Sequence, residues 1–153
     1  MKAWELADEF RRVFAADAAF AAINCRVMQD DTDRIYPTLI FSCQTRPIDA
    51  HGRALAWQLH VIIETHAFDL EGATPSDEAH AAWVSAAQRK FFGTAAADLA
   101  TAKAALTAAL GAGGKFTLRN YDAPPTDGDP GIEQHRFRTP LLIAGLAVVT
   151  GDV

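Results

Sequence analysis

The sequence feature that most constrains the fold is the stretch ALAWQLHVIIETHAF, residues 54–68, in which two kinds of side chain alternate. Successive side chains of a β-strand point to opposite faces of a sheet, so residues two apart share a face. One phase is entirely apolar: Leu55, Trp57, Leu59, Val61 and Ile63. The other phase is mixed: Gln58, His60, Ile62, Glu64 and His66. The pattern predicts a long strand with Trp57 buried and His60 on a face at least partly open to water.

A second strand is predicted immediately before this one, at residues 36–46, where Leu39, Phe41 and Cys43 occupy alternate positions. The segment PIDAHG, residues 47–52, lies between the two strands and is rich in residues that favour turns. Two alternating strands joined by a turn form a hairpin. We therefore expect a long antiparallel hairpin at the centre of the sheet.

Three helices are predicted from apolar residues spaced three and four apart. The first covers residues 2–22. The second covers residues 75–92, where Pro75 suits the first helical position. The third is the alanine-rich segment 95–110, which the glycines directly after it end. The helices are expected to pack on one face of the sheet.

Further strands are predicted at residues 24–28, 115–121 and 132–150. The last should be broken or bulged near Pro140 and Gly145, because a proline cannot donate to the sheet ladder. A chain of 153 residues is long enough to bury one core. The fold class predicted is α+β: a single domain, residues 1–153, with an antiparallel sheet around a long central hairpin, an N-terminal helix and two further helices on one face.

Composition argues against two classes of partner. The net charge is -5, and the 14 basic residues are scattered along the chain instead of clustered as phosphate binding requires. The longest apolar run, residues 141–149, is about half of the roughly 20 residues that a membrane-spanning helix needs. The N-terminal segment mixes acids and bases through its apolar positions, which is not the pattern of a signal peptide. We therefore expect neither nucleic-acid specificity nor membrane insertion.

Motifs for cofactors and nucleophiles are weak or incomplete. Cys25 and Cys43 are too few for a zinc site and too far apart for a CxxC pair, although a disulfide between neighbouring strands stays open. The glycine-rich segment 111–117 lacks the first glycine of a phosphate loop and has Phe116 where a hydroxyl is required. The segment 122–133 lacks carboxylates that a calcium loop needs. No cofactor and no catalytic residue is predicted.

The candidate metal ligands reduce to one pair. His60, Glu64 and His66 share a strand face, but residues two apart on a strand lie about 7 Å apart, so only Glu64 and His66 are close enough to share an ion. A structural or catalytic metal site needs three or four protein ligands. A complete site would require the fold to bring His80 or His135 next to Glu64 and His66. We therefore expect a polar sheet face without a metal.

The order of elements resembles that of the small tail-completion and tail-terminator proteins of long-tailed bacteriophages. The segments that carry the resemblance are FAAIN, IYPTLIFSCQ, ALAWQLHVIIETHAF, DEAHAAW, FTLRNYD and HRFRTP. The resemblance implies a non-enzymatic tail-terminator, tail-completion or head-tail joining subunit that self-assembles into a ring, a hexamer in such families. Its partners would be further copies of itself and tail-tube or connector proteins. Its location would be the cytoplasm during assembly and then the virion tail.

A contact between subunits is predicted at the loop of residues 122–131. Three prolines restrict its backbone and reduce the entropy lost on ordering, while it carries three aspartates and no basic residue. Such a loop suits a neighbour that presents arginines, although a solvated connection between two strands is the alternative. The candidate interface residues are Asp122, Asp127, Asp129, Arg119, Arg136 and Arg138.

An alternative of a different class is a small ligand-binding protein or enzyme. Its cleft would lie over the mixed face of the long strand, with the helix that contains Trp83 as the roof. The floor of that cleft would be Gln58, His60, Glu64 and His66. Genes for portal, tail-tube and tape-measure proteins beside this one would favour the phage interpretation.

Overall fold

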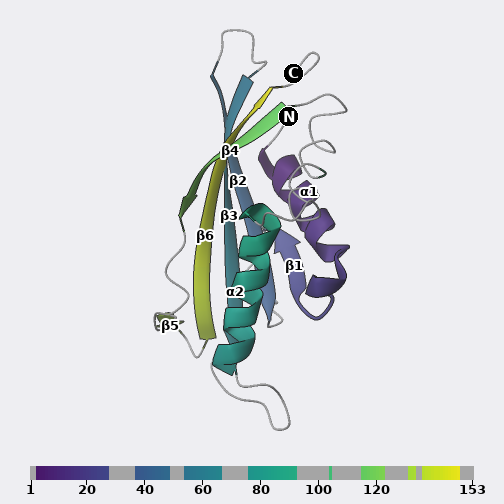
Figure 1. The fold of residues 1–153 in the computed structure, drawn as a ribbon, viewed down its shortest axis with the longest axis vertical. Helices are drawn as coiled ribbons and strands as arrows, with labels where there is room; N and C mark the ends of the chain where they lie inside the picture. Colours follow the sequence, from purple (N-terminus) through teal and green to yellow (C-terminus); the bar gives the residue numbers. More distant parts are fainter. Residues whose placement is uncertain are drawn as a thin grey trace.

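The computed structural model describes residues 3–27, 37–48, 54–66, 76–92, 104, 115–122, 131–133 and 136–148. Two helices lie on one face of a twisted sheet of six strands (Figure 1). The elements are α1 (Ala3–Ala15), the short 3-10 helix η1 (Ala18–Phe20), β1 (Asn24–Val27), β2 (Thr38–Pro47), β3 (Ala54–His66), α2 (Ser76–Phe92), β4 (Lys115–Asp122), β5 (Gly131–Glu133) and β6 (Arg136–Val148). The described elements form an α+β fold.

The sheet is mixed, and the prediction of a wholly antiparallel sheet was wrong. The strand order is β1-β2-β3-β6-β4, with β5 also paired to β6. Strand β1 runs parallel to β2, with Asn24 opposite Thr38, whereas the other pairs are antiparallel. A parallel pair needs a longer connection than a tight turn. Ten residues, 28–37, separate β1 from β2, which is more than a tight turn.

The first helix is shorter than the predicted span of residues 2–22. Helix α1 ends at Ala15, and the side chain of Asp17 accepts a hydrogen bond from the backbone N–H of Ala19 at 2.8 Å, which caps η1. Aspartate competes for backbone donors in this way and so favours helix starts over helix interiors. The second helix has nearly the predicted bounds. The third predicted helix, residues 95–110, lies outside the described residues except for Ala104.

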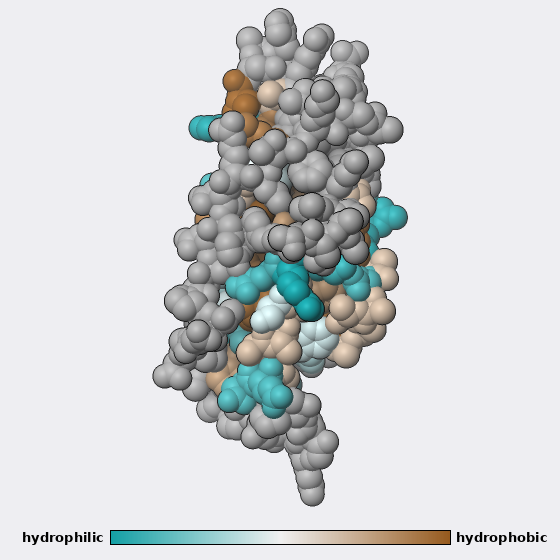
Figure 2. Space-filling model, in the orientation of Figure 1, coloured by the Kyte–Doolittle hydropathy of each residue, from teal (hydrophilic) through white to brown (hydrophobic). Residues whose placement is uncertain are grey.

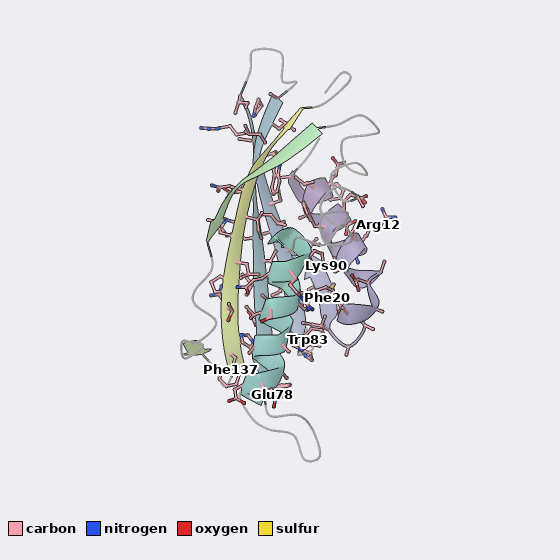
Figure 3. All side chains as sticks on the ribbon, viewed as in Figure 1. Arg12, Phe20, Glu78, Trp83, Lys90 and Phe137 are labelled. Atoms are coloured by element: carbon pink, nitrogen blue, oxygen red, sulfur yellow. The ribbon has the colours of Figure 1, made fainter. Side chains whose placement is uncertain are left out.

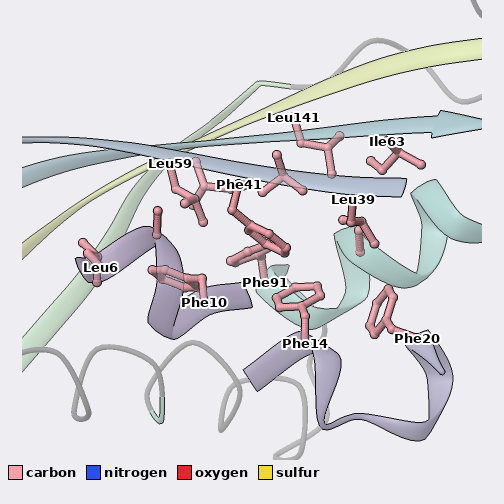
Figure 4. Packing of buried hydrophobic residues seen from close by; sticks show 14 of the residues in the cluster. Leu6, Phe10, Phe14, Phe20, Leu39, Phe41, Leu59, Ile63, Phe91 and Leu141 are labelled. Atoms are coloured by element: carbon pink, nitrogen blue, oxygen red, sulfur yellow. The ribbon is translucent and has the colours of Figure 1, made fainter. Parts of the chain in front are cut away.

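The core is an aromatic cluster between the helices and the sheet (Figure 4). Phe14 of α1 lies at its centre, with ring centroids 4.9 Å from Phe20, 5.2 Å from Phe41 and 5.3 Å from Phe91. Trp57 of β3 packs against Phe10 of the same helix at 5.8 Å. The spacing of Phe10 and Phe14, four residues apart, places both rings on the side of α1 that faces the sheet. These contacts join α1, η1, β2, β3 and α2 in one core.

Strand β3 confirms the predicted alternation over its first half. Trp57 is buried with 2% of its surface exposed, Gln58 is exposed and His60 is half-buried. Further along, Ile62 and Glu64 lie on the face opposite the helices and yet are buried. The prediction of a partly open second face is therefore confirmed at Gln58, His60 and His66. It is wrong at Ile62 and Glu64, which are buried.

Pro140 lies inside strand β6, which is continuous from Arg136 to Val148. On one side Pro140 is opposite Ile62 of β3. On the other side β5 pairs with residues 136–138 and β4 with residues 142–148, so among the described strands Pro140 falls in the gap between them. A proline without an N–H is tolerated where a strand has one unpaired side. The predicted break at Pro140 is thus absent from β6. The predicted irregularity near Gly145 is found in the pairing with β4, where the register shifts between Leu118, opposite Gly145, and Asn120, opposite Ala144.

The two cysteines are free thiols. Cys25 is opposite Leu39 and Cys43 is opposite Leu59, so the two cysteines are four positions apart along β2, or about 13 Å. That distance is about twice the Cα separation that a disulfide allows, roughly 7 Å at most. Burial raises the pKa of Cys25 to about 11 and that of Cys43 to about 12. Both thiols are therefore protonated at neutral pH and act as small apolar side chains.

Candidate functional site

The four residues predicted as the floor of a cleft lie on the face of β3 that the described helices do not cover. Helix α2 packs on the opposite face, where Val84, Ala87 and Phe91 join the core. Trp83 stacks against Phe20 of η1, with ring centroids 6.1 Å apart (Figure 3). The prediction that the Trp83 helix roofs the residues Gln58, His60, Glu64 and His66 was therefore wrong. Alternation places residues on a face but does not say which face a later helix will cover.

Glu64 is the most deeply buried carboxylate among the described residues, with 1% of its surface exposed. Arg138 is opposite it in the register of β3 and β6, and the Arg138 Nε atom lies 3.7 Å from Glu64 Oε1. On the other side Thr38 is opposite Glu64 in β2, and its hydroxyl donates to the Asn24 carbonyl at 2.9 Å. A buried carboxylate is stable only when charges and donors compensate its desolvation. Arg138, predicted as an interface residue, contacts Glu64 of its own chain.

Replacing Arg138 with methionine should lower the free energy of unfolding by about 1–3 kcal/mol, because the Glu64 carboxylate loses a nearby cation while staying buried. Glu64→Gln added to Arg138→Met should recover much of that loss. Arg12→Met is the matched control: Arg12 pairs with Glu9 at 2.9 Å on the exposed side of α1 and should cost less than about 1 kcal/mol. Urea unfolding of the four proteins measures the difference. Equal costs for Arg138→Met and Arg12→Met would show that the Glu64 pair contributes no more than a surface pair.

The remaining candidate interface residues are not brought to one place by the described backbone. Asp122 is opposite Leu142 of β6, and Arg136 is six positions away from Leu142 along the same strand, or about 20 Å. Arg119 lies at the irregularity of β4. Asp127 and Asp129 lie outside the described residues. The predicted contact joins the acidic loop of one subunit to arginines of another, so the structure of a single chain does not test it.

Sequence reasoning missed the polar cluster around His80, a residue of α2 with 2% of its surface exposed. The imidazole Nδ1 lies 3.0 Å from the hydroxyl oxygen of Thr65 on β3, and Nε2 lies 2.7 Å from that of Thr139 on β6. Phe137, at the start of β6, lies beside the His80 ring with a centroid distance of 5.7 Å. Burial lowers the pKa of His80 from 6.5 to about 4. The ring is therefore neutral at physiological pH and ties α2 to two strands.

The spacing of α2 contains a signal for this cluster. His80, Val84, Ala87 and Phe91 are separated by four, three and four residues, which is the spacing of one helix face, and all four are buried. The alanine-rich sequence drew attention to Trp83 instead, which is only partly buried. A histidine in a helical core stripe requires hydrogen-bond partners from whatever packs on it. Here the partners are Thr65 of β3 and Thr139 of β6, which lie on the face of the sheet that α2 covers.

The described residues contain no group of three or more histidine, cysteine, aspartate or glutamate side chains that could hold a metal ion. The Glu64 and His66 pair gains no third ligand within that part of the chain. Among the helices that the structure describes, none has the length and apolar character needed to cross a membrane.

No family model matches the chain, and no curated protein matches it either.

Proposed function

We propose that this protein is a structural subunit of a long-tailed phage or prophage, a tail-terminator, tail-completion or head-tail joining protein that acts by assembling into a ring. The resemblance of the element order to such proteins supports this proposal. The proposed subunit has β2 and β3 as one long hairpin and a further helix at residues 95–110. The protein would be present in the cytoplasm during assembly and in the virion tail afterwards. Its partners would be further copies of itself and tail-tube or connector proteins.

The observation that carries the proposal is the difference between the two faces of the sheet. One face is covered by α1 and α2, and over α2 hydrophilic residues are mixed with mildly hydrophobic ones (Figure 2). The opposite face carries no described helix, and on it β3 and β6 present partly buried apolar side chains: Ala56, Leu142, Ala144 and Leu146. Apolar side chains gathered on an open face are typical of protein interfaces. This face is the surface that another subunit would cover.

The apolar part of this face has a polar border. Strand β2 lies beside β3 and presents exposed Gln44 and Arg46 on the same face, with half-buried Ser42 next to them. An apolar centre with a polar rim is the usual composition of an interface between folded subunits. A ring also requires a second, different patch on each subunit, because its contacts join unlike surfaces head to tail. The acidic loop of residues 122–131 is the second patch in this proposal.

Light scattering at increasing protein concentration tests the role of the sheet face. Leu146→Lys places a charge among the partly buried apolar residues, and we expect it to weaken self-association at least about tenfold, since burying an unpaired charge at an interface costs several kcal/mol. Ser85→Lys places the same charge on the exposed side of α2 and should leave association unchanged. Circular dichroism checks that both variants fold. If both variants associate as the wild type does, this face is not the interface.

A further inference from the structure

His80 is the polar link between α2 and the sheet at the N-terminal half of that helix. It lies five positions into α2, and its two ring nitrogens reach hydroxyls on two different strands. Further along the same helix the attachments are apolar, through Val84, Ala87 and Phe91, and the side chain of Lys90 pairs with Asp17 of the η1 cap. Both halves of α2 therefore have apolar contacts, and in the first half the hydrogen bonds of His80 to Thr65 and Thr139 add to the ring contact with Phe137.

The hydrogen bonds of His80 suit the neutral ring. A neutral imidazole has one N–H donor and one acceptor nitrogen, so one threonine hydroxyl accepts from the ring and the other donates to it. Protonation turns both nitrogens into donors. The hydroxyl that had donated must then turn its hydrogen away from the ring, in a site where Thr65 and Thr139 are both buried. A buried donor without an acceptor costs about 1–3 kcal/mol.

The charges near His80 do not favour protonation. On β3, Glu64 and His66 point to the opposite face of the sheet, as does Arg138 on β6, since they alternate with Thr65, Phe137 and Thr139. On α2, Asp77 and Glu78 are exposed, and the Asp77 carboxylate accepts from the Glu78 backbone N–H at 2.9 Å. Among the described residues, the hydrogen-bond partners of the ring are the two hydroxyls. An imidazolium here would be buried without a described counter-ion.

We propose that His80, Thr65 and Thr139 form an acid-sensitive latch, which holds the N-terminal half of α2 on the sheet while the imidazole is neutral and releases it when the imidazole is protonated. Release exposes the apolar surface of β3 and β6 beneath the helix. The apolar contacts of Phe91 and the Lys90–Asp17 pair keep the C-terminal half in place. The latch is independent of ring assembly and depends only on contacts within one chain.

The sign of the pH dependence follows from the direction of the shift. The pKa of His80 is lowered in the folded protein, from 6.5 to about 4, so the released helix binds the proton more tightly than the closed one. Stabilisation of the closed state is complete above pH 6.5 and is lost as the pH falls toward about 4. Between pH 7 and pH 5 the equilibrium for opening should rise about 20-fold.

Hydrogen exchange of the full chain, expressed as protection factors at pH 7 and pH 5, tests the latch. Amides of the first half of α2 should lose about 20-fold in protection, while those of β3 and β6 at the centre of the sheet should not change. His80→Gln keeps one donor and one acceptor but cannot titrate, and its α2 protection should not depend on pH. His60→Gln, the matched control on the opposite face of β3, should keep the wild-type response.

A pH-independent wild type would overturn the latch, and so would a His80→Gln variant with the wild-type loss of protection. If His80→Gln fails to fold, nuclear magnetic resonance titration of the His80 ring in the wild type decides. The latch requires a ring that stays neutral well below pH 6 and α2 amide signals that shift together with its protonation. A ring that protonates near pH 6.5 without any change in α2 would also overturn it.

Discussion

Replacing Trp57 with alanine should lower the free energy of unfolding by about 3–5 kcal/mol, among the largest effects of any single substitution in this protein. The side chain is 2% exposed and packs against Phe10 between β3 and α1. Its removal leaves a cavity that the neighbouring aromatic rings cannot fill without moving. Urea unfolding followed by circular dichroism measures the change.

His60→Ala is the control for Trp57→Ala, because His60 lies three positions along the same strand and on the opposite face. It should fall within about 0.5 kcal/mol of the wild type. Trp57→Phe keeps most of the buried volume but removes the indole N–H. The Nε1 atom is buried and has no hydrogen-bond partner among the described residues, so its loss there costs no hydrogen bond. We expect Trp57→Phe to cost much less than Trp57→Ala. Equal destabilisation by His60→Ala and Trp57→Ala would show that the strand register is wrong.

Phe14→Ala should cost a similar amount, about 3–5 kcal/mol, because Phe14 is fully buried and contacts rings from η1, β2 and α2. The loss therefore weakens three connections at once: that of α1 to the sheet, that of α1 to η1 and that between the two helices. Thermal unfolding and urea unfolding both report it.

Trp4→Ala is the matched control on the same helix, since Trp4 is a larger aromatic residue but 55% exposed. It should change the free energy of unfolding by less than about 1 kcal/mol. A Trp4→Ala variant as unstable as Phe14→Ala would mean that α1 packs with a different face toward the sheet.

The spacing of apolar side chains was sufficient to predict which segments around the core are helices and which are strands. The buried phase of β3, the inward face of α1 and the bounds of α2 all follow from side-chain spacing. Spacing alone does not determine the direction of β1, because parallel and antiparallel neighbours present the same alternation. Nor does it predict the burial of Glu64 and Ile62, which depends on what covers the second face of the sheet.

The residues of greatest chemical interest were the hardest to predict, for the same reason. His80, Thr65 and Thr139 come from a helix and two strands that are distant in the sequence, and their hydrogen bonds exist only after those elements meet. Glu64 was recognised as a titratable residue on a strand face, but its partner Arg138 was assigned to a neighbouring subunit. Cross-strand register decides that pairing, and a single sequence does not contain it.

Determination of the assembly state tests the proposed function most directly. Sedimentation velocity of the wild-type protein over a wide concentration range, alone and with tail-tube protein, distinguishes a closed ring from a monomer. The ring proposal predicts one discrete oligomer, a hexamer by resemblance, that forms at high concentration or on the end of tail tubes. In Leu146→Lys it should require at least about tenfold more protein to form. A wild-type protein that stays monomeric at every concentration and does not bind tubes would contradict it.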